Sequence, residues 1–163
     1  MSSSGAAVAW ARRHCAVGAG RATRCCCGYR ESDREETLRP PPLEFAATVV
    51  GGEVTTEERD GWDGYVFGLA GNEDGTAGCL LVQRADDPEP HEEPYCLVWG
   101  DWEGTTYGGV ESVEVKPGEV TFEMTTLNAA ELGTPRHFRI TFPAEHTDDV
   151  RAGLRRTLGE VVS

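Results

Sequence analysis

The stretch VESVEVKPGEVTFEMT, residues 110–125, predicts an antiparallel β-hairpin. Apolar and polar side chains alternate along both arms, as they do on strands that bury one face. Pro-Gly at 117–118 fits the centre of a type II turn, because Pro presets φ and Gly accepts a positive φ. We therefore expect the two arms to bury one shared face, made of Val113, Val115, Val120, Phe122 and Met124.

Short apolar runs at close spacing continue this pattern toward the N-terminus. Gly, Asp, Asn and Pro separate the runs, which is typical of a β-meander. The run at 79–83 is apolar on both faces, so it is predicted to be a central strand. The expected strands in this part of the chain are residues 43–50, 64–70, 79–83 and 95–99.

Toward the C-terminus the sequence predicts one more strand and two helical segments. Residues 128–131 (NAAE) resemble a capping box on a short helical turn. Residues 137–142 alternate strictly and predict a strand. Thr147 is expected to cap a closing helix whose apolar stripe lies on the sheet. The fold class is therefore α+β, mostly β: an antiparallel meander of about six or seven strands with a C-terminal helix packed on the sheet.

The first 42 residues differ from the rest of the chain. They are rich in Ala, Gly, Arg and Cys, show no helical or strand periodicity, and end in three prolines at 40–42. Arg12 and Arg13 interrupt the only apolar run that a signal peptide could use. We expect residues 1–42 to be a disordered N-terminal extension and residues 43–163 to be an acidic β-rich domain. A start codon assigned too far upstream is the alternative origin of the extension.

The charge is divided unevenly between these two parts. Residues 1–42 hold seven arginines and four acids, a net charge of +3, and the whole chain carries −13, so residues 43–163 carry −16. Such a domain repels nucleic acid and anionic membrane surfaces. Its expected partner is a basic protein, with no direct nucleic-acid or membrane binding. The oligomeric state stays open.

Cysteine usage points to a reducing compartment. Cys79 and Cys96 each lie inside an apolar run of the acidic part, where free cysteine is an ordinary small core residue. We therefore expect a cytoplasmic protein. No apolar run approaches the ~20 residues of a membrane span.

Motifs for catalysis or cofactor binding are missing from the acidic part. It holds no G-x-S-x-G elbow, no pair of histidines at metal-binding spacing and no Gly-Lys-Ser/Thr phosphate cradle. The sequence predicts no catalytic residue, no metal and no cofactor. One enzymatic alternative stays open: Asp101 and Glu103 share a face if the chain is extended there, as the carboxylate pair of a carbohydrate-acting hydrolase would.

The segment at 99–109 is the best candidate for a partner-binding surface. It combines aromatic residues with acids and glycines. Aromatic anchors ringed by charged groups suit protein interfaces. Trp99 is expected in the core, and the predicted partner-binding residues are Asp101, Trp102, Glu103 and Tyr107.

Three stretches resemble the immunity protein 10 family of bacterial polymorphic toxin systems. They are DGWDGYVFGLA at 60–70, LLVQR at 80–84 and TYGGVESV at 106–113, and the likeness covers about residues 43–160. The resemblance implies a mostly β domain that binds and neutralises a cognate toxin, often a nuclease, with no catalytic residues. An adaptor domain with another partner remains the alternative among binding proteins.

Overall fold

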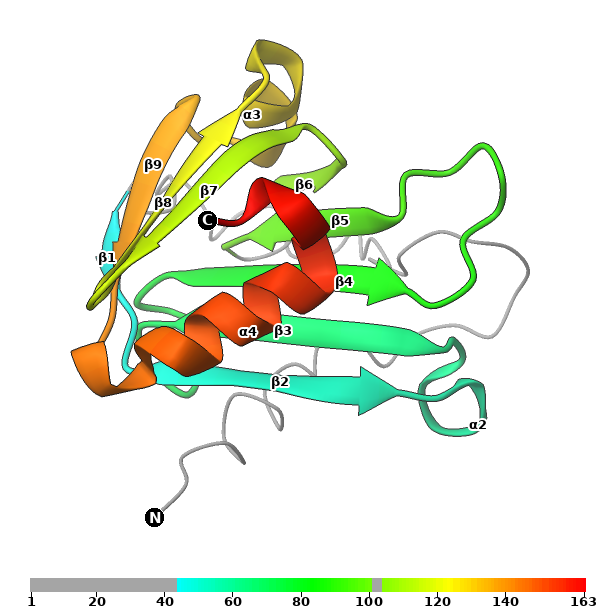
Figure 1. The fold of residues 1–163 in the computed structure, drawn as a ribbon, viewed down its shortest axis with the longest axis horizontal. Helices are drawn as coiled ribbons and strands as arrows, with labels where there is room; N and C mark the ends of the chain where they lie inside the picture. Colours follow the sequence, from blue (N-terminus) through cyan, green and yellow to red (C-terminus); the bar gives the residue numbers. More distant parts are fainter. Residues whose placement is uncertain (1–43, 101–103) are drawn as a thin grey trace, which may run out of the picture.

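The computed structural model describes residues 44–100 and 104–163, and they form two β-sheets with helices against them (Figure 1). The larger sheet has five strands in the order β2-β3-β4-β5-β6, and every neighbouring pair is antiparallel. A short helix, α2 (Glu57–Asp60), connects the first two of them. Its strands are β2 (Val49–Thr55), β3 (Gly64–Ala70), β4 (Cys79–Ala85), β5 (Tyr95–Trp99) and β6 (Gly104–Tyr107).

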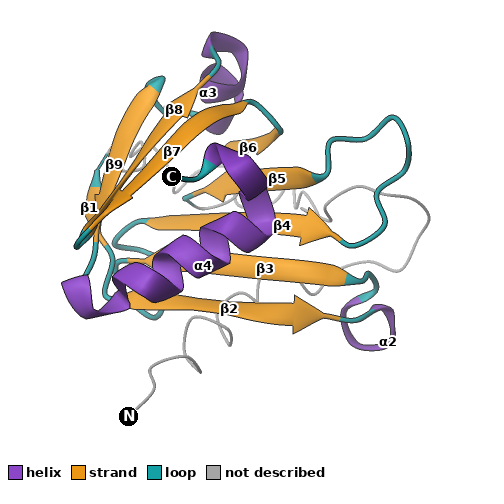
Figure 2. Cartoon of the chain, viewed as in Figure 1, coloured by secondary structure: helices purple, strands orange, loops and turns teal. Residues whose placement is uncertain are grey.

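The smaller sheet has four strands in the order β1-β9-β8-β7. They are β1 (Phe45–Ala46), β7 (Val110–Lys116), β8 (Glu119–Met124) and β9 (His137–Thr141). The remaining elements are α3 (Thr126–Leu132), η1 (Ala144–His146), α4 (Thr147–Leu158) and η2 (Gly159–Val161). The longest helix, α4, crosses the five-stranded sheet on the face that looks toward the smaller sheet (Figure 2).

The structure confirms the fold class and the hairpin. Val113 pairs with Phe122 and Val115 with Val120, and all five predicted side chains of the shared face are buried. Gly118 has a φ of 75°, as the second central residue of a type II turn requires. The strand at 64–70 has the predicted bounds, and β4 is the middle strand of its sheet.

The single strand predicted at 43–50 is wrong, because the chain changes sheets within it. Phe45 and Ala46 pair in parallel with β9, whereas Val49 begins the antiparallel pairing with β3. The backbone N–H of Ala47 still donates to Thr141 at 2.7 Å, and that of Thr48 donates to Ala70 at 2.9 Å. The polar backbone groups at this crossing are therefore satisfied from both sheets.

Both predicted helix starts are displaced. Thr125 caps α3, since its hydroxyl oxygen accepts a hydrogen bond from the N–H of Asn128, which therefore lies inside the helix. Thr147 is the first residue of α4 and not its cap: its hydroxyl donates to Ala144 at 2.7 Å and accepts from the N–H of Gly118 at 3.2 Å. The threonine thus joins the helix start to the hairpin turn.

The main core lies between the two sheets and under α4. Val150 and Leu154 of the predicted helical stripe are fully buried in it. The helix comes very close to the sheet at Gly153, where an added Cβ would lie only 2.1 Å from the ring of Phe67. This close approach fixes α4 across the strands whose far ends carry the candidate site.

Candidate protein-binding surface

The most acidic part of the described surface lies at one end of the five-stranded sheet. The β2–β3 connection, residues 56–63, and the β4–β5 connection, residues 86–94, are both at this end because the strands are antiparallel (Figure 1). The backbone N–H of Asp86 donates to the carbonyl of Asp63 at 3.1 Å and joins the two connections. We call this region the acidic end; its exposed acids are Glu57, Glu58, Asp63, Asp86, Asp87, Glu89, Glu92 and Glu93.

The first connection is held in place by its own side chains. The carboxylate of Asp63 accepts the backbone N–H of Glu57 at 2.8 Å and thereby satisfies a free donor at the start of α2. The ring of Trp62 lies against Gly64, where an added Cβ would be only 2.2 Å from it. The exposed acids of this connection are consequently presented on a fixed backbone.

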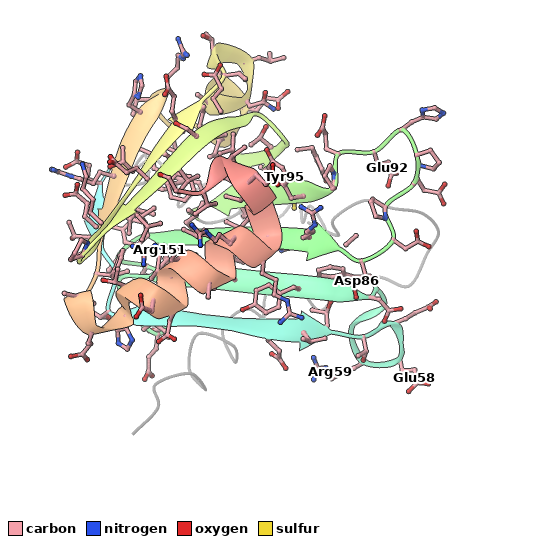
Figure 3. The ribbon with its side chains drawn as sticks, viewed as in Figure 1. Glu58, Arg59, Asp86, Glu92, Tyr95 and Arg151 are labelled. Atoms are coloured by element: carbon pink, nitrogen blue, oxygen red, sulfur yellow. The ribbon has the colours of Figure 1, made fainter. Side chains whose placement is uncertain are left out.

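The acids of the acidic end are not offset by nearby bases. The two connections contain no lysine and a single arginine, Arg59, besides His91. Its guanidinium lies 3.0 Å from the carboxylate of Glu53 and donates to the carbonyl of Val54 at 2.6 Å. Figure 3 shows Glu58 and Arg59 beside Asp86, with Glu92 farther along the second connection. The region therefore presents a concentrated negative potential.

Tyr107 lies next to the acidic end. It closes β6 with 42% of its surface exposed, and the N–H of the following Gly108 donates to the carbonyl of Tyr95 at 3.1 Å. A Cβ on Gly108 would be 2.8 Å from the carboxyl group of Glu93. An exposed aromatic residue in a segment that contacts an acidic residue is a combination that a basic protein surface can contact.

The side chain of Tyr95, on the strand next to β6, stabilises the start of β7. Its hydroxyl oxygen accepts the backbone N–H of Val110 at 3.2 Å. Burial is the main cause that raises the pKa of Tyr95 above its usual value, so the phenol stays neutral at pH 7. A neutral hydroxyl there fixes the entry to β7 without adding charge.

The TYGG motif at 106–109 anchors α3 to β6. Gly108 and Gly109 both have a positive φ, which few other residues adopt. The side-chain amide of Asn128 donates to the buried Thr106 hydroxyl at 2.8 Å and to the carbonyl of Tyr107 at 3.1 Å. The motif therefore has a structural role, and it sets the backbone position of Tyr107.

Asn128→Ala is expected to lower the free energy of unfolding by about 1–3 kcal/mol, because buried partners of its side chain lose their hydrogen bonds. Those partners include Thr106, whose hydroxyl also donates to Glu131 at 2.8 Å. Urea unfolding followed by circular dichroism measures the change. Leu127→Ala is the control on the same helix, since Leu127 is 70% exposed, and it should stay within about 0.5 kcal/mol of the parent. Equal stabilities for the two variants would contradict the anchoring role.

The structure describes only one of the four predicted partner-binding residues, Tyr107. Asp101, Trp102 and Glu103 lie outside the described residues, as does the predicted extension at 1–42. Tyr107 is exposed at the place just described, and Trp99 is buried as expected. The acids of the two connections were recognised in the sequence only as part of the charge excess. Their grouping follows from the strand pairing, which brings two separate loops to one end of the sheet.

Residues 44–100 and 104–163 hold no cluster of three or more His, Cys, Asp or Glu side chains that could bind a metal ion. Within the same ranges no helix is long and apolar enough to cross a bilayer.

Fold and surface together define a small two-sheet α+β domain with a strongly acidic end. The sequence profile described as Immunity protein 10 matches residues 50–150, which include both acidic connections and most of the strands. The chain belongs to the Immunity protein 10 family. Comparison with curated proteins and with solved structures gave no match.

Proposed function

We propose that this protein is an immunity protein that binds and neutralises a cognate bacterial toxin without catalysing a reaction. The observation that carries the proposal is the family match over residues 50–150. The toxin is inferred to be basic and of the nuclease type, because a nuclease must present positive charge to hold phosphates. Residues 43–163, with a net charge of −16, complement such a surface.

The acidic end and Tyr107 are the proposed contact surface, together with Asp101, Trp102 and Glu103. A concentrated negative potential speeds the encounter with a basic partner. Steered associations reach on the order of 10⁸ M⁻¹s⁻¹ or more at low salt. An exposed ring next to the carboxylates supplies apolar contact once the surfaces have met. Occupying the substrate groove of a nuclease in this way would inhibit it without any chemical step.

The proposed site of action is the bacterial cytoplasm. Both cysteines in the described residues, Cys79 and Cys96, are buried and form no disulfide with each other. Cysteines outside disulfides are usual in a reducing compartment. A nuclease-type toxin also meets its substrate there, so an inhibitor must be present in the same place.

Co-expression tests the proposed function. The protein encoded beside this gene would be produced in a host with and without the full 163-residue chain. We expect the neighbour to stop growth alone and growth to return with the chain, accompanied by co-purification of the two proteins. Growth arrest that persists despite well-expressed, folded chain would overturn the proposal for that neighbour. A neighbour that does not stop growth on its own would also count against the proposal.

A further inference from the structure

The outer face of the five-stranded sheet, on the side away from α4, carries a group of apolar side chains beside Gln83 and Thr105. A second cluster of buried side chains lies on it, separate from the main core and packed against Trp62. Strand pairing places them in neighbouring rows, and Gly51 lies opposite Gly68 in one of these rows. We call these residues the outer cluster: Val49, Val66, Ala70, Cys79, Leu81 and Val98.

The outer cluster is more deeply buried than an open sheet face allows. Leu81 is 0% exposed and Val98 is 1% exposed. The described α3 and α4 and the four-stranded sheet all pack against the opposite face, on side chains such as Phe67 and Leu97. An antiparallel sheet with one solvated face carries polar side chains there, whereas strands covered on both faces are apolar throughout. Both the composition and the burial of the outer cluster therefore call for a covering segment.

Residues 1–43 join the described fold at the end of the five-stranded sheet where β3 ends and β4 begins. Phe45 packs against Gly78, the residue before Cys79 of the outer cluster. The N–H of Thr48 donates to the carbonyl of Ala70, another member of the cluster, at 2.9 Å. A seven-residue strand is about 23 Å long and five strands span about 19 Å. A chain of 43 residues can reach about 140 Å when extended, so it is long enough to cross the face several times.

The chemistry of residues 1–43 also matches what they would cover. They carry a net charge of +3 against −16 on the rest of the chain, so the two parts attract each other. They also contain apolar side chains such as Val8 and Trp10, which an apolar surface can bury. We propose that the outer face is a docking surface whose occupant is residues 1–43 of the same chain. The contact needs no regular secondary structure in that segment.

Site-specific photocross-linking of the full chain tests this contact. Thr105 pairs with Val98 on the outer face and is half-buried, so Thr105→benzoylphenylalanine places a photoreactive ring beside the outer cluster. We expect irradiation to give intramolecular cross-links, which mass spectrometry locates within residues 1–43. Ser112→benzoylphenylalanine is the control, because Ser112 is exposed on β7, the strand of the other sheet that is farthest from β1. It should give no cross-link to residues 1–43.

A second cross-linking position keeps the test valid if the Thr105 variant does not fold. Ala85 lies on the same outer face at the end of β4, opposite Gly64. Ala85→benzoylphenylalanine should give the same class of product, and circular dichroism would verify that each variant is folded. Covalent dimers would assign the face to a second copy. Dimers, products located only outside residues 1–43, or an absence of products at both folded positions would each overturn the proposal.

Discussion

Trp99→Ala is expected to lower the free energy of unfolding by about 3–5 kcal/mol, the usual cost of removing a buried aromatic side chain. Trp99 is the largest fully buried side chain among the described residues. It stands on β5 of one sheet and meets the ring of Phe138, in the other sheet, edge-on at 4.9 Å. The rings of Trp99 and Phe45 also make an edge contact, with 5.5 Å between their centroids. The substitution therefore removes an aromatic link between the two sheets.

Trp99→Phe separates the ring contacts from the indole N–H. The buried Nε1 of Trp99 has no hydrogen-bond partner in the described part of the structure, and an unpaired buried donor costs stability. Phenylalanine keeps an aromatic ring at the sheet junction and removes this donor, so we expect a loss below about 1.5 kcal/mol. Urea unfolding of both variants is the measurement. If Trp99→Ala costs no more than Trp99→Phe, the ring of Trp99 does not hold the sheets together.

The sequence predicts the elements whose own residues show a clear alternation of apolar and polar side chains or a turn motif. The hairpin at 110–125 has alternation on both arms and a Pro-Gly turn, and each signal is read within a few residues. The strand at 64–70 was predicted for the same reason. Its inward side chains Tyr65, Phe67 and Leu69 all contribute to the main core.

Local sequence patterns do not predict features that depend on pairing with strands distant in the chain. The change of sheets between Ala46 and Val49 depends on pairing with β9 and with β3, and both sheets accept the same apolar side chains. The strand β6 (Gly104–Tyr107) was not predicted, because its Gly and Thr residues give no apolar alternation. It forms by pairing with β5, which supplies the missing register.

The acidic character of the candidate site could be predicted from the sequence, whereas its position in the fold could not. The charge excess of residues 43–163 predicts an acidic domain, and Tyr107 is 42% exposed, but partner binding by Tyr107 stays a prediction. The acidic end itself is formed by loops about 30 residues apart in the chain. Only the antiparallel pairing of β3 with β4 brings Asp63 to Asp86.

Reversing three charges at the acidic end is expected to slow association with the toxin by about 10- to 100-fold at low salt. The variant is Glu58→Lys, Asp87→Lys and Glu92→Lys, all exposed and none of them used to cap α2. The toxin is the neighbouring gene product recovered by co-expression, and stopped-flow or surface-based kinetics at several salt concentrations give the association rate constant. The defect should shrink as salt rises, because screening weakens steering for parent and variant alike.

A matched variant distinguishes a local surface from net charge. Glu44→Lys, Glu73→Lys and Glu145→Lys change the total charge by the same amount at exposed positions before β1, after β3 and in η1, away from the acidic end (Figure 1). If the acidic end is the contact surface, this variant should lose far less of the association rate, since potential close to the docking site dominates steering. Equal losses would mean that only overall charge matters, and a toxin that binds both variants as fast as the parent would rule out electrostatic steering. A rate defect confined to the acidic end, with unchanged unfolding free energy, would place the toxin on the two connections that Asp63 and Asp86 join.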